Sequence, residues 1–398
     1  MPWFILFVAL VGNCGFWLFW FNRVNATGIR RPITKAIEKL IVFVCFLIPA
    51  LIFAIEGSAI AIWLSLIDGS LSLPDAPIAT YYGGFCVISF FVLGALWVES
   101  RRSLKPPKQL ISETTELHDV HAEVGTPANK ATSWLIQVPG NQIGQLSVTR
   151  KEFALPRAIP ELEGFRIAHI SDIHLTGQYQ FKHHEFVLDR LMELEADTIL
   201  ISGDLIDHDH CLSQLDQLIE TMHAKYGVYF VFGNHDLRLK DMIMLSRRIT
   251  DKGAIDLGLE NRSFAVGDAI VTLFGNERPW LERRSAEQIA AQQEAAAPNE
   301  NHFRIGVSHT PDQFNWARRC HCDLLFAGHT HGGQMRLPVL GSLLSPSLYG
   351  SRYSSGVFHR LPTLMHVSRG VAGTYPLRWF CPPEISLKTT RAHSVTCL

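Results

Sequence analysis

The chain has 398 residues, and its 36 Lys and Arg against 37 Asp and Glu give a formal net charge of −1 at pH 7. This balance provides no electrostatic footprint for nucleic acid, so we expect no nucleic-acid partner. Hydrophobic residues make up 47 % of the chain, and a membrane region of about 100 residues would leave room for one further domain of about 250.

Three apolar segments occupy the amino-terminal part of the chain. Residues 3–21 and 80–98 carry no charge, and residues 40–67 carry only Glu56. Each segment passes the roughly 18-residue length of a spanning helix, so residues 1–102 are predicted to form a membrane region with three transmembrane helices. Glu56 is expected to face a partner helix or bound lipid, unless the middle of the second segment is broken or interfacial.

Basic residues are distributed unevenly around these segments. Five Lys and Arg lie between the first and second segments, and four follow the third. The only charged residues in the loop between the second and third segments are Asp68 and Asp75. The positive-inside rule therefore predicts a multi-pass membrane protein with its amino terminus outside and its carboxyl-terminal domain in the cytoplasm. The eight cysteines, three of them inside apolar segments, form no disulfide framework.

The next segments are predicted from their composition. Residues 103–142 contain Pro106-Pro107, a Ser/Thr/Glu run and the stretch from Gly125 to Lys130, which is typical of a linker, so we place a catalytic domain at 143–398. Residues 282–301, rich in Ala, Gln and Glu, are expected to form an inserted surface helix or a mobile loop. Cys320-His321-Cys322 lacks a second ligand pair at zinc spacing and is interpreted as a helix-to-strand connection.

Five polar motifs follow apolar runs of strand length at 165–170, 198–201, 228–232, 303–307 and 324–326. Continuous apolar runs are typical of strands buried on both faces of a sheet, and ligands bind at the carboxyl edge of such sheets. Helical spacing at 182–195 and 212–225 alternates with these runs, and 263–274 is predicted to form two antiparallel strands turned at Gly267-Asp268. The motifs are Ser171-Asp172-Ile173-His174, Gly203-Asp204-Leu205-Ile206-Asp207, Gly233-Asn234-His235-Asp236, Ser308-His309 and Gly328-His329-Thr330-His331.

The ordered set resembles the calcineurin-like metallophosphoesterase family, whose signature is D-x-H, G-D-x-x-D, G-N-H-D or G-N-H-E, a lone His, and G-H-x-H. The resemblance spans about 143–385 and implies an α/β fold, a two-sheet sandwich flanked by helices. It implies that Asp172, His174 and His331 hold one metal, that Asn234, His309 and His329 hold a second, and that Asp204 bridges them. It also implies that His235 assists the leaving group and that Asp207 orients His235.

Each motif alone has an ordinary structural interpretation, such as a helix cap at Asp172 or a left-handed turn at Asn234, and it is the ordered set that favours a metal site. A mixed His, Asp and Asn shell suits two divalent ions, with Mn expected and Fe or Zn as alternatives. Two such ions roughly 3.5 to 4 Å apart can stabilise phosphoryl transfer. The carboxylate beside His235 is expected to raise the pKa of that imidazole, and the role of Asp236 stays open.

Three carboxyl-terminal segments, 328–338, 353–358 and 368–385, look like the bacterial YkuE and YaeI branch of the family, which includes the LpxG-type UDP-2,3-diacylglucosamine pyrophosphatases. His208, Asp209 and Asp236 stand where the protein Ser/Thr phosphatases have Arg, Gly and Glu, which disfavours protein phosphatase activity. Arg336, Arg369 and Arg378 are candidate phosphate clamps, or equally surface or interfacial charges.

The resemblance and the apolar segments together predict a hydrolase of the bacterial inner membrane, acting from the cytoplasmic side on a phosphorylated lipid or small molecule. UDP-2,3-diacylglucosamine, from lipid A synthesis, is the leading substrate. A broad nucleotide or phospholipid-headgroup phosphodiesterase is the alternative enzyme, and a non-catalytic membrane sensor of a phosphorylated ligand is the alternative of another class. The sequence leaves the oligomeric state open.

Overall fold

The protein is described here by a computed structural model. The chain forms two compact units, Met1–Lys105 and Pro106–Leu398, and each is described by itself. The residues that the structure describes are 2–56, 78–102, 105–126, 129–130, 133–155, 157–284, 288, 301–338, 340–373 and 375–392.

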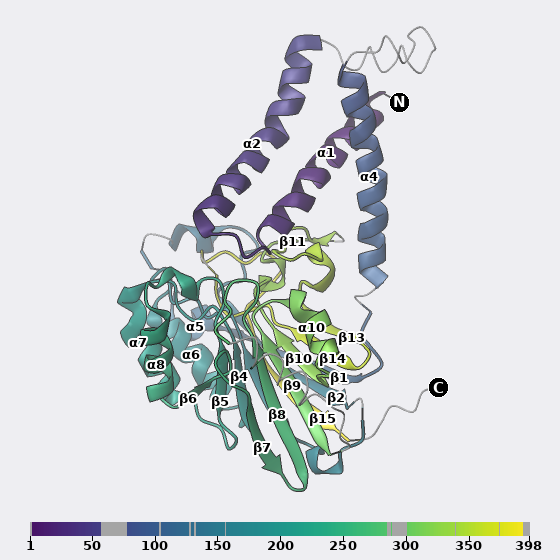
Figure 1. The fold of residues 1–398 in the computed structure, drawn as a ribbon. Coiled ribbons are helices and arrows are strands. Elements are labelled where there is room, and N and C mark those ends of the chain that lie inside the picture. Colours follow the sequence, from purple (N-terminus) through teal and green to yellow (C-terminus); the bar gives the residue numbers. More distant parts are fainter. Residues whose placement is uncertain are drawn as a thin grey trace. The chain divides into compact units, whose positions relative to one another are not determined.

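The first unit contains the helices α1 (Pro2–Val24), α2 (Arg31–Glu56) and α4 (Ile78–Arg102), purple to blue in Figure 1. Asn13 joins all three, because its amide donates to the carbonyl of Cys45 at 3.0 Å and its carbonyl accepts from Tyr82 at 2.5 Å. A Cβ at Gly12 would collide with the Cys86 carbonyl, so the glycine allows α1 to approach α4 closely.

Two stretches of these helices, Phe4–Val24 and Thr80–Arg101, are long and apolar enough to cross a membrane. They coincide with the first and third predicted spans. The second predicted span begins within α2, but its part beyond residue 56 lies outside the described residues.

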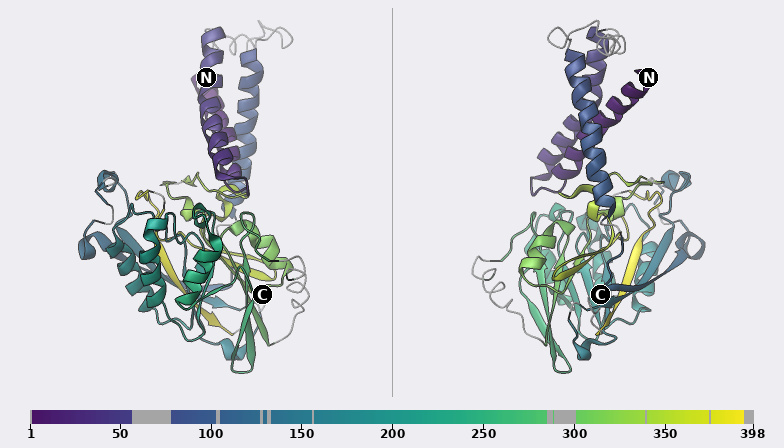
Figure 2. Two further views of the ribbon diagram at one scale, coloured as in Figure 1. Left: turned by 60° about the vertical axis from the view of Figure 1, so that its left-hand side comes forward. Right: turned by 90° about the vertical axis from the view of Figure 1, so that its right-hand side faces the viewer.

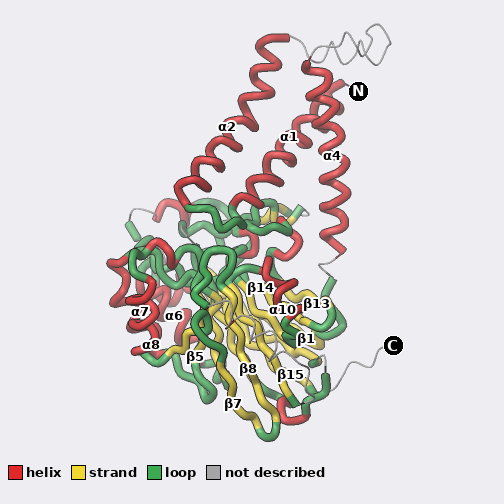
Figure 3. Tube along the Cα trace, viewed as in Figure 1, coloured by secondary structure: helices red, strands yellow, loops and turns green. Residues whose placement is uncertain are grey.

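The second unit contains two large sheets that pack face to face. The first has the order β1-β2-β15-β3-β4-β5-β6 and the second β13-β14-β10-β9-β8-β7, and both layers are visible as yellow strands in Figure 3. Strands β3, β4 and β5 are parallel to one another, as are β8, β9, β10 and β14.

The strands of the first sheet are β1 (Leu110–Asp119), β2 (Gln145–Ala154), β15 (Glu384–Arg391), β3 (Arg166–Ile170), β4 (Thr198–Ser202), β5 (Val228–Val231) and β6 (Ala254–Asp256). Those of the second are β13 (Gly356–Arg360), β14 (Thr363–Val367), β10 (Leu324–Ala327), β9 (His302–Ser308), β8 (Ala269–Asn276) and β7 (Arg262–Val266), and β11 (Arg336–Leu337) pairs separately with β12 (Gly341–Ser342).

Helices cover the outer faces of the sandwich. The helices α6 (Phe181–Met192), α7 (Leu212–Thr221) and α8 (Met242–Asp251), teal in Figure 2, share a core with the outer face of the first sheet. A second core, including Leu200, Val271 and Phe326, fills the space between the sheets. Helix α10 (Phe314–Arg319) packs on the other face of the second sheet. This arrangement confirms the predicted two-sheet α/β sandwich flanked by helices.

The predicted linker differs from the structure. Residues 103–142 were expected to form a linker, but they contribute β1, the short helix α5 (Val120–Val124) and a 3₁₀ turn at Ser133–Gln137. Strand β1 pairs antiparallel with β2 at the edge of the first sheet, and most of its side chains are exposed. The polar composition that is typical of a linker therefore belongs to a solvated edge strand.

Other predicted elements lie where the sequence indicated. Strands β7 and β8 pair antiparallel across Gly267-Asp268, and Cys320 to Cys322 join α10 to β10. The predicted insertion at 282–301 lies largely outside the described residues.

Candidate metal centre

The five polar motifs occupy loops at the carboxyl ends of β3, β4, β5, β9 and β10. Several candidate ligands there have left-handed backbones that non-glycine residues rarely adopt: φ is 53° at Asp172, 55° at Asp204 and 70° at His329. Such sharp turns aim neighbouring side chains at one point, and residues held in this way cluster at functional sites. The structure brings all nine predicted site residues to this edge.

His174 and His331 present bare ring nitrogens to each other. The Nδ1 atom of His174 donates to Asp207 at 2.8 Å, and that of His331 donates to the carbonyl of Ala372 at 3.0 Å. Each ring therefore keeps its lone pair on Nε2, and these two Nε2 atoms lie 3.3 Å apart. Oδ1 of Asp172 lies 3.6 Å from Nε2 of His331. Two ring nitrogens and a carboxylate that converge on one point fit a bound cation, which would take the place of any proton held there.

A second group has the same character. Nδ1 of His309 donates to the carbonyl of Ser202 at 2.7 Å, so its Nε2 carries the lone pair in the neutral ring. That Nε2 lies 3.2 Å from Oδ1 of Asn234 and 3.2 Å from Nδ1 of His329. Oxygen and nitrogen acceptors again converge on one point.

Asp204 faces both groups. Its Oδ1 accepts the backbone N–H of His235 at 2.7 Å. Its Oδ2 is buried without a hydrogen-bond partner, at 3.6 Å from Nε2 of His174 and 3.2 Å from Nε2 of His309. Asp172, His174, Asp204 and His331 lie within reach of one ion, and Asp204, His309 and His329 within reach of another. An orphaned carboxylate oxygen between two sets of bare nitrogens fits two divalent cations that share it.

Comparison with known proteins agrees with this geometry. Residues 165–333 match the calcineurin-like phosphoesterase family. The match contains all five polar motifs completely, so it is this part of the chain that is similar to the family. Similar relatives are the uncharacterized metallophosphoesterase YkuE of Bacillus subtilis (26 % identical, covering 58 % of this chain and 80 % of the relative), the UDP-2,3-diacylglucosamine pyrophosphatase LpxG of Chlamydia muridarum (24 %, 61 % and 88 %) and the phosphodiesterase YaeI of Escherichia coli (26 %, 56 % and 81 %). The domain match and these bacterial relatives support a metal-dependent phosphoesterase.

The charge states at the metal centre differ from ligand to ligand. Burial lowers the pKa of His329 and His331 well below the usual value, so both rings are neutral near pH 7. Burial would also lower the pKa of His309, but the Asp204 carboxylate raises it to about 9. Burial opposes the ionised form of Asp204, yet the neighbouring His309 and His235 hold its pKa well below the usual value. A neutral imidazole and an ionised carboxylate are the forms that bind metals, so an ion would have to displace the proton that His309 holds near pH 7.

His235 belongs to a different arrangement. Its Nδ1 donates to Asp207 at 2.6 Å, and Asp207 also accepts from His174, so one carboxylate orients two rings. Arg238, which the sequence analysis did not single out, donates to Asp207 and lies with Nη2 3.2 Å from Nε2 of His235. The expected rise in pKa is wrong, because burial and the charge of His174 lower the pKa of His235 despite the adjacent carboxylates.

Asp236, whose role the sequence left open, holds the metal loops together. Its buried carboxylate accepts the backbone N–H groups of Asp204, Leu205, Ile206 and Gly233 at distances of 2.7 to 3.0 Å. Burial and the charge of Asp204 raise the pKa of Asp236 to about 7. The side chain therefore joins the loop after β4 to the loop after β5 rather than facing an ion.

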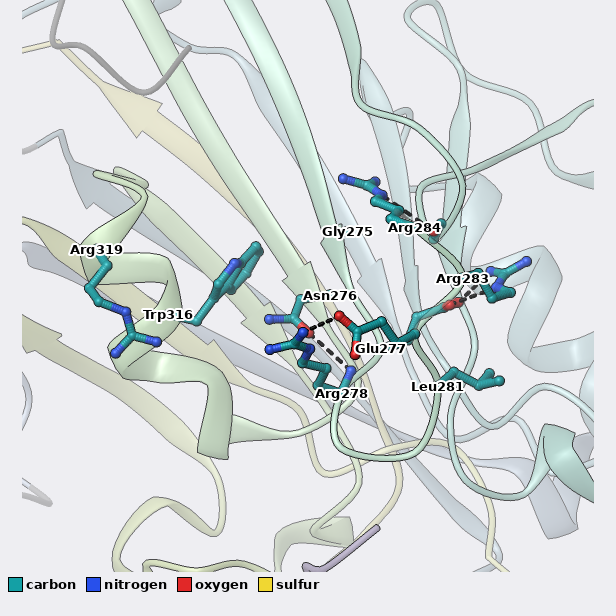
Figure 4. Close-up of a pocket in the computed structure, with 11 residues that line it drawn as sticks. Gly275, Asn276, Glu277, Arg278, Leu281, Arg283, Arg284, Trp316 and Arg319 are labelled. Carbon is teal, nitrogen blue, oxygen red and sulfur yellow. Dashed lines mark hydrogen bonds and ion pairs between the residues drawn. The ribbon is translucent and has the colours of Figure 1, made fainter. Parts of the chain in front are cut away.

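Trp280 was also missed by the sequence analysis. Its ring centroid lies 4.6 Å from that of His329 and 5.6 Å from that of His309. The loop that carries it is held by Glu277, which accepts the N–H of Phe232 at 2.7 Å and an Arg283 N–H at 2.7 Å. Figure 4 shows Glu277 and Arg283 on this loop, in a pocket lined by none of the predicted metal ligands.

The three candidate phosphate clamps are engaged elsewhere. Arg378 is buried and donates to the carbonyls of His331, Arg369 and Ala372. Arg369 pairs with Glu384 at 3.0 Å. Arg336 donates to the carbonyl of Gly332 and to Ser355. These arginines brace the loops around His331, so the hypothesis that they clamp phosphate loses its support.

Proposed function

We propose that the protein is a membrane-anchored phosphohydrolase that holds two divalent ions, with Mn the expected metal, and cleaves a lipid-linked phosphodiester or pyrophosphate such as UDP-2,3-diacylglucosamine. The observation that carries the dinuclear site is Oδ2 of Asp204, which is buried without a hydrogen-bond partner between two groups of bare imidazole nitrogens.

The roles of the residues follow from their contacts. Asp172, His174 and His331 would hold one ion, and Asn234, His309 and His329 the other, with Asp204 shared between them. When bound, the ions would activate water and stabilise negative charge on the phosphoryl oxygens. The hydrogen bonds of His174 to Asp207 and of His331 to Ala372 fix the ring orientations that ligation needs.

His235 and Arg238 would act on the leaving group. The side chains of His235 and Arg238 are partly exposed and therefore accessible to a substrate, whereas those of His174 and Asp207 are fully buried. The guanidinium can donate to the oxygen on which charge develops, and the imidazole can do so once its Nε2 is protonated.

Replacement of the shared carboxylate tests the dinuclear site. Asp204→Ala should abolish hydrolysis and deplete both metals, because two cations without the carboxylate between them repel each other. Elemental analysis of the purified protein measures the metal content, with Asp209→Ala, exposed on the following loop, as the control. Two ions per chain retained in Asp204→Ala would contradict the assignment.

The membrane anchor and the lipid substrate are supported by two observations. Among the residues that the structure describes, two helices have the length and composition to span a membrane, and the LpxG relative is a UDP-2,3-diacylglucosamine pyrophosphatase. A lipid substrate stays in the bilayer, so an anchored enzyme meets it at a raised effective concentration. We place the catalytic unit on the cytoplasmic side of the bacterial inner membrane, in line with the positive-inside rule.

Acyl-chain dependence tests the substrate. Because each buried CH₂ adds about 0.8 kcal/mol, kcat/KM for UDP-2,3-diacylglucosamine in detergent micelles with Mn should greatly exceed that for its deacylated analogue. Similar values for the two would support the broad phosphodiesterase instead. Absence of turnover on lipid and nucleotide substrates alike, with metals bound, would support the non-catalytic sensor.

A further inference from the structure

Two segments of the catalytic unit form one surface beside the metal loops. Residues 334–348 follow the metal-site residue His331, and residues 375–380 lie against them. Met335 and Trp379 form a bridge, the N–H of Arg336 donates to the carbonyl of Trp379 at 2.9 Å, and the N–H of Trp379 donates to the carbonyl of Gln334 at 3.0 Å. The β11–β12 hairpin, labelled at β11 in Figure 1, belongs to this surface.

This surface exposes large apolar side chains, which we call the apolar rim. Their exposed fractions run from 39 % at Met335 to 58 % at Tyr375. Exposed apolar residues that gather on one surface mark an interaction site, whereas isolated ones are ordinary. The apolar rim consists of Met335, Leu340, Leu344, Leu348, Tyr375 and Phe380.

The surrounding chain is basic. From Leu324 to Pro383 the sequence contains no Asp or Glu, whereas it contains five arginines. Three of these arginines, Arg336, Arg369 and Arg378, brace the loops, so it is the lack of carboxylates that makes this stretch compatible with an anionic membrane surface. On such a surface, apolar side chains enter the boundary of the acyl chains.

The chain also limits how far this unit can lie from a membrane. Helix α4 ends at Arg102 and strand β1 begins at Leu110. The intervening residues span at most about 25 Å even when fully extended. If α4 crosses the bilayer, the catalytic unit stays within that reach of the headgroups.

We propose that the apolar rim docks on the anionic surface of the lipid bilayer, so that the metal loop around His331 opens onto the headgroup layer. This inference rests on the membrane attachment in the proposed function, and it adds the surface by which the catalytic unit contacts the lipid. A second copy of the chain or another protein on the rim is the competing outcome of the test.

Site-specific photo-crosslinking tests the docking. The full-length chain is produced in bacterial membranes with p-benzoylphenylalanine in place of Leu344 or Phe380, and lipid adducts are measured by mass spectrometry. The matched control is Leu361, which is 74 % exposed. Leu361 precedes β14 and Ser368 follows it, so the control lies at the opposite end of that strand from the metal-site loop. We expect roughly tenfold more phospholipid adduct at Leu344 and Phe380 than at Leu361, because only side chains in the interface contact acyl chains.

The outcomes separate the docking from the proposed function. Equal lipid labelling at Leu344 and Leu361 would overturn the docking. So would labelling at Leu344 that yields adducts with protein, either a second copy of the chain or another protein, and none with lipid. Crosslinking requires no turnover, so loss of the substrate proposal leaves this result unaffected. Release of the unlabelled full-length chain from membranes by alkaline carbonate would overturn the attachment and the docking together.

Discussion

At the scale of single residues, His235 and Arg238 act through the same carboxylate. Both donate to Oδ1 of Asp207, and Arg238 also reaches Nε2 of His235. We expect His235→Ala to keep its metals and to lower kcat by about 10² to 10⁴, the usual share of a general acid or base. Arg238→Met should lower kcat as well, and the double variant should lose little more than the worse single variant, because groups that act as a unit are not additive.

The control for these variants is how strongly the loss of kcat depends on the leaving group of the substrate. An activated aryl phosphodiester needs little help in its departure, so both variants should lose less on that substrate than on a lipid diester. Equal losses on both substrates, or additive losses in the double variant measured by steady-state kinetics, would show that His235 and Arg238 serve the structure instead.

Trp280 provides a second prediction at this scale. The ring covers His329, whose Nε2 is buried without a hydrogen-bond partner. Trp280→Ala should admit water and loosen this ring, raising the dissociation constant of one of the two metals by about 10- to 100-fold, as loss of a supporting contact does. Metal titration by isothermal calorimetry measures this change, with the exposed Trp134→Ala as control. Unchanged affinity at both sites would limit Trp280 to packing.

At the scale of elements, Asp236 connects the ends of β4 and β5. Asp236→Asn would turn an amide NH₂ toward backbone N–H groups that now donate to the carboxylate. We expect a loss of unfolding free energy on the order of 3 kcal/mol, because buried donors would be left without acceptors. Thermal unfolding of the metal-free protein measures it, with the exposed Asp209→Asn as control. A matching melting temperature in the two variants would mean that the loops hold together without this carboxylate.

The central strands were predictable because they are buried on both faces. Strands β4 and β5 are mainly apolar runs, β3 contains Arg166 and His169 among its apolar residues, and each strand is followed by a polar motif. Strand β1 was not predictable in this way. It lies at the edge of a sheet, and its exposed Ser, Thr and Glu side chains resemble those of a linker. The place of β15 between β2 and β3 depends on pairing across more than two hundred residues, which no local pattern encodes.

The site was predictable only where a motif encodes it. The residues of the five motifs meet because parallel strands deliver their loops to one edge. Arg238 lies three residues after His235, a spacing that could have drawn attention to it, whereas Trp280 comes from a separate loop without a recognisable pattern. The fall in the pKa of His235 depends on burial, which the sequence does not give.

At the scale of the whole molecule, the distribution of basic residues predicts a topology. Lys and Arg flank the first and third apolar segments on the side that should remain in the cytoplasm, and the loop with Asp68 and Asp75 carries none. A protease recognition sequence inserted after Thr126 should be cleaved in inside-out membrane vesicles, whereas one inserted at Asp75 should be cleaved only in right-side-out vesicles. Each insertion serves as the control for the other, and fragment sizes on a gel report the cleavage. The reverse pattern would place the catalytic unit outside the cytoplasm. Cleavage of both sites from the same side would mean that the chain between Asp75 and Thr126 crosses the membrane an even number of times, which contradicts the single span predicted there.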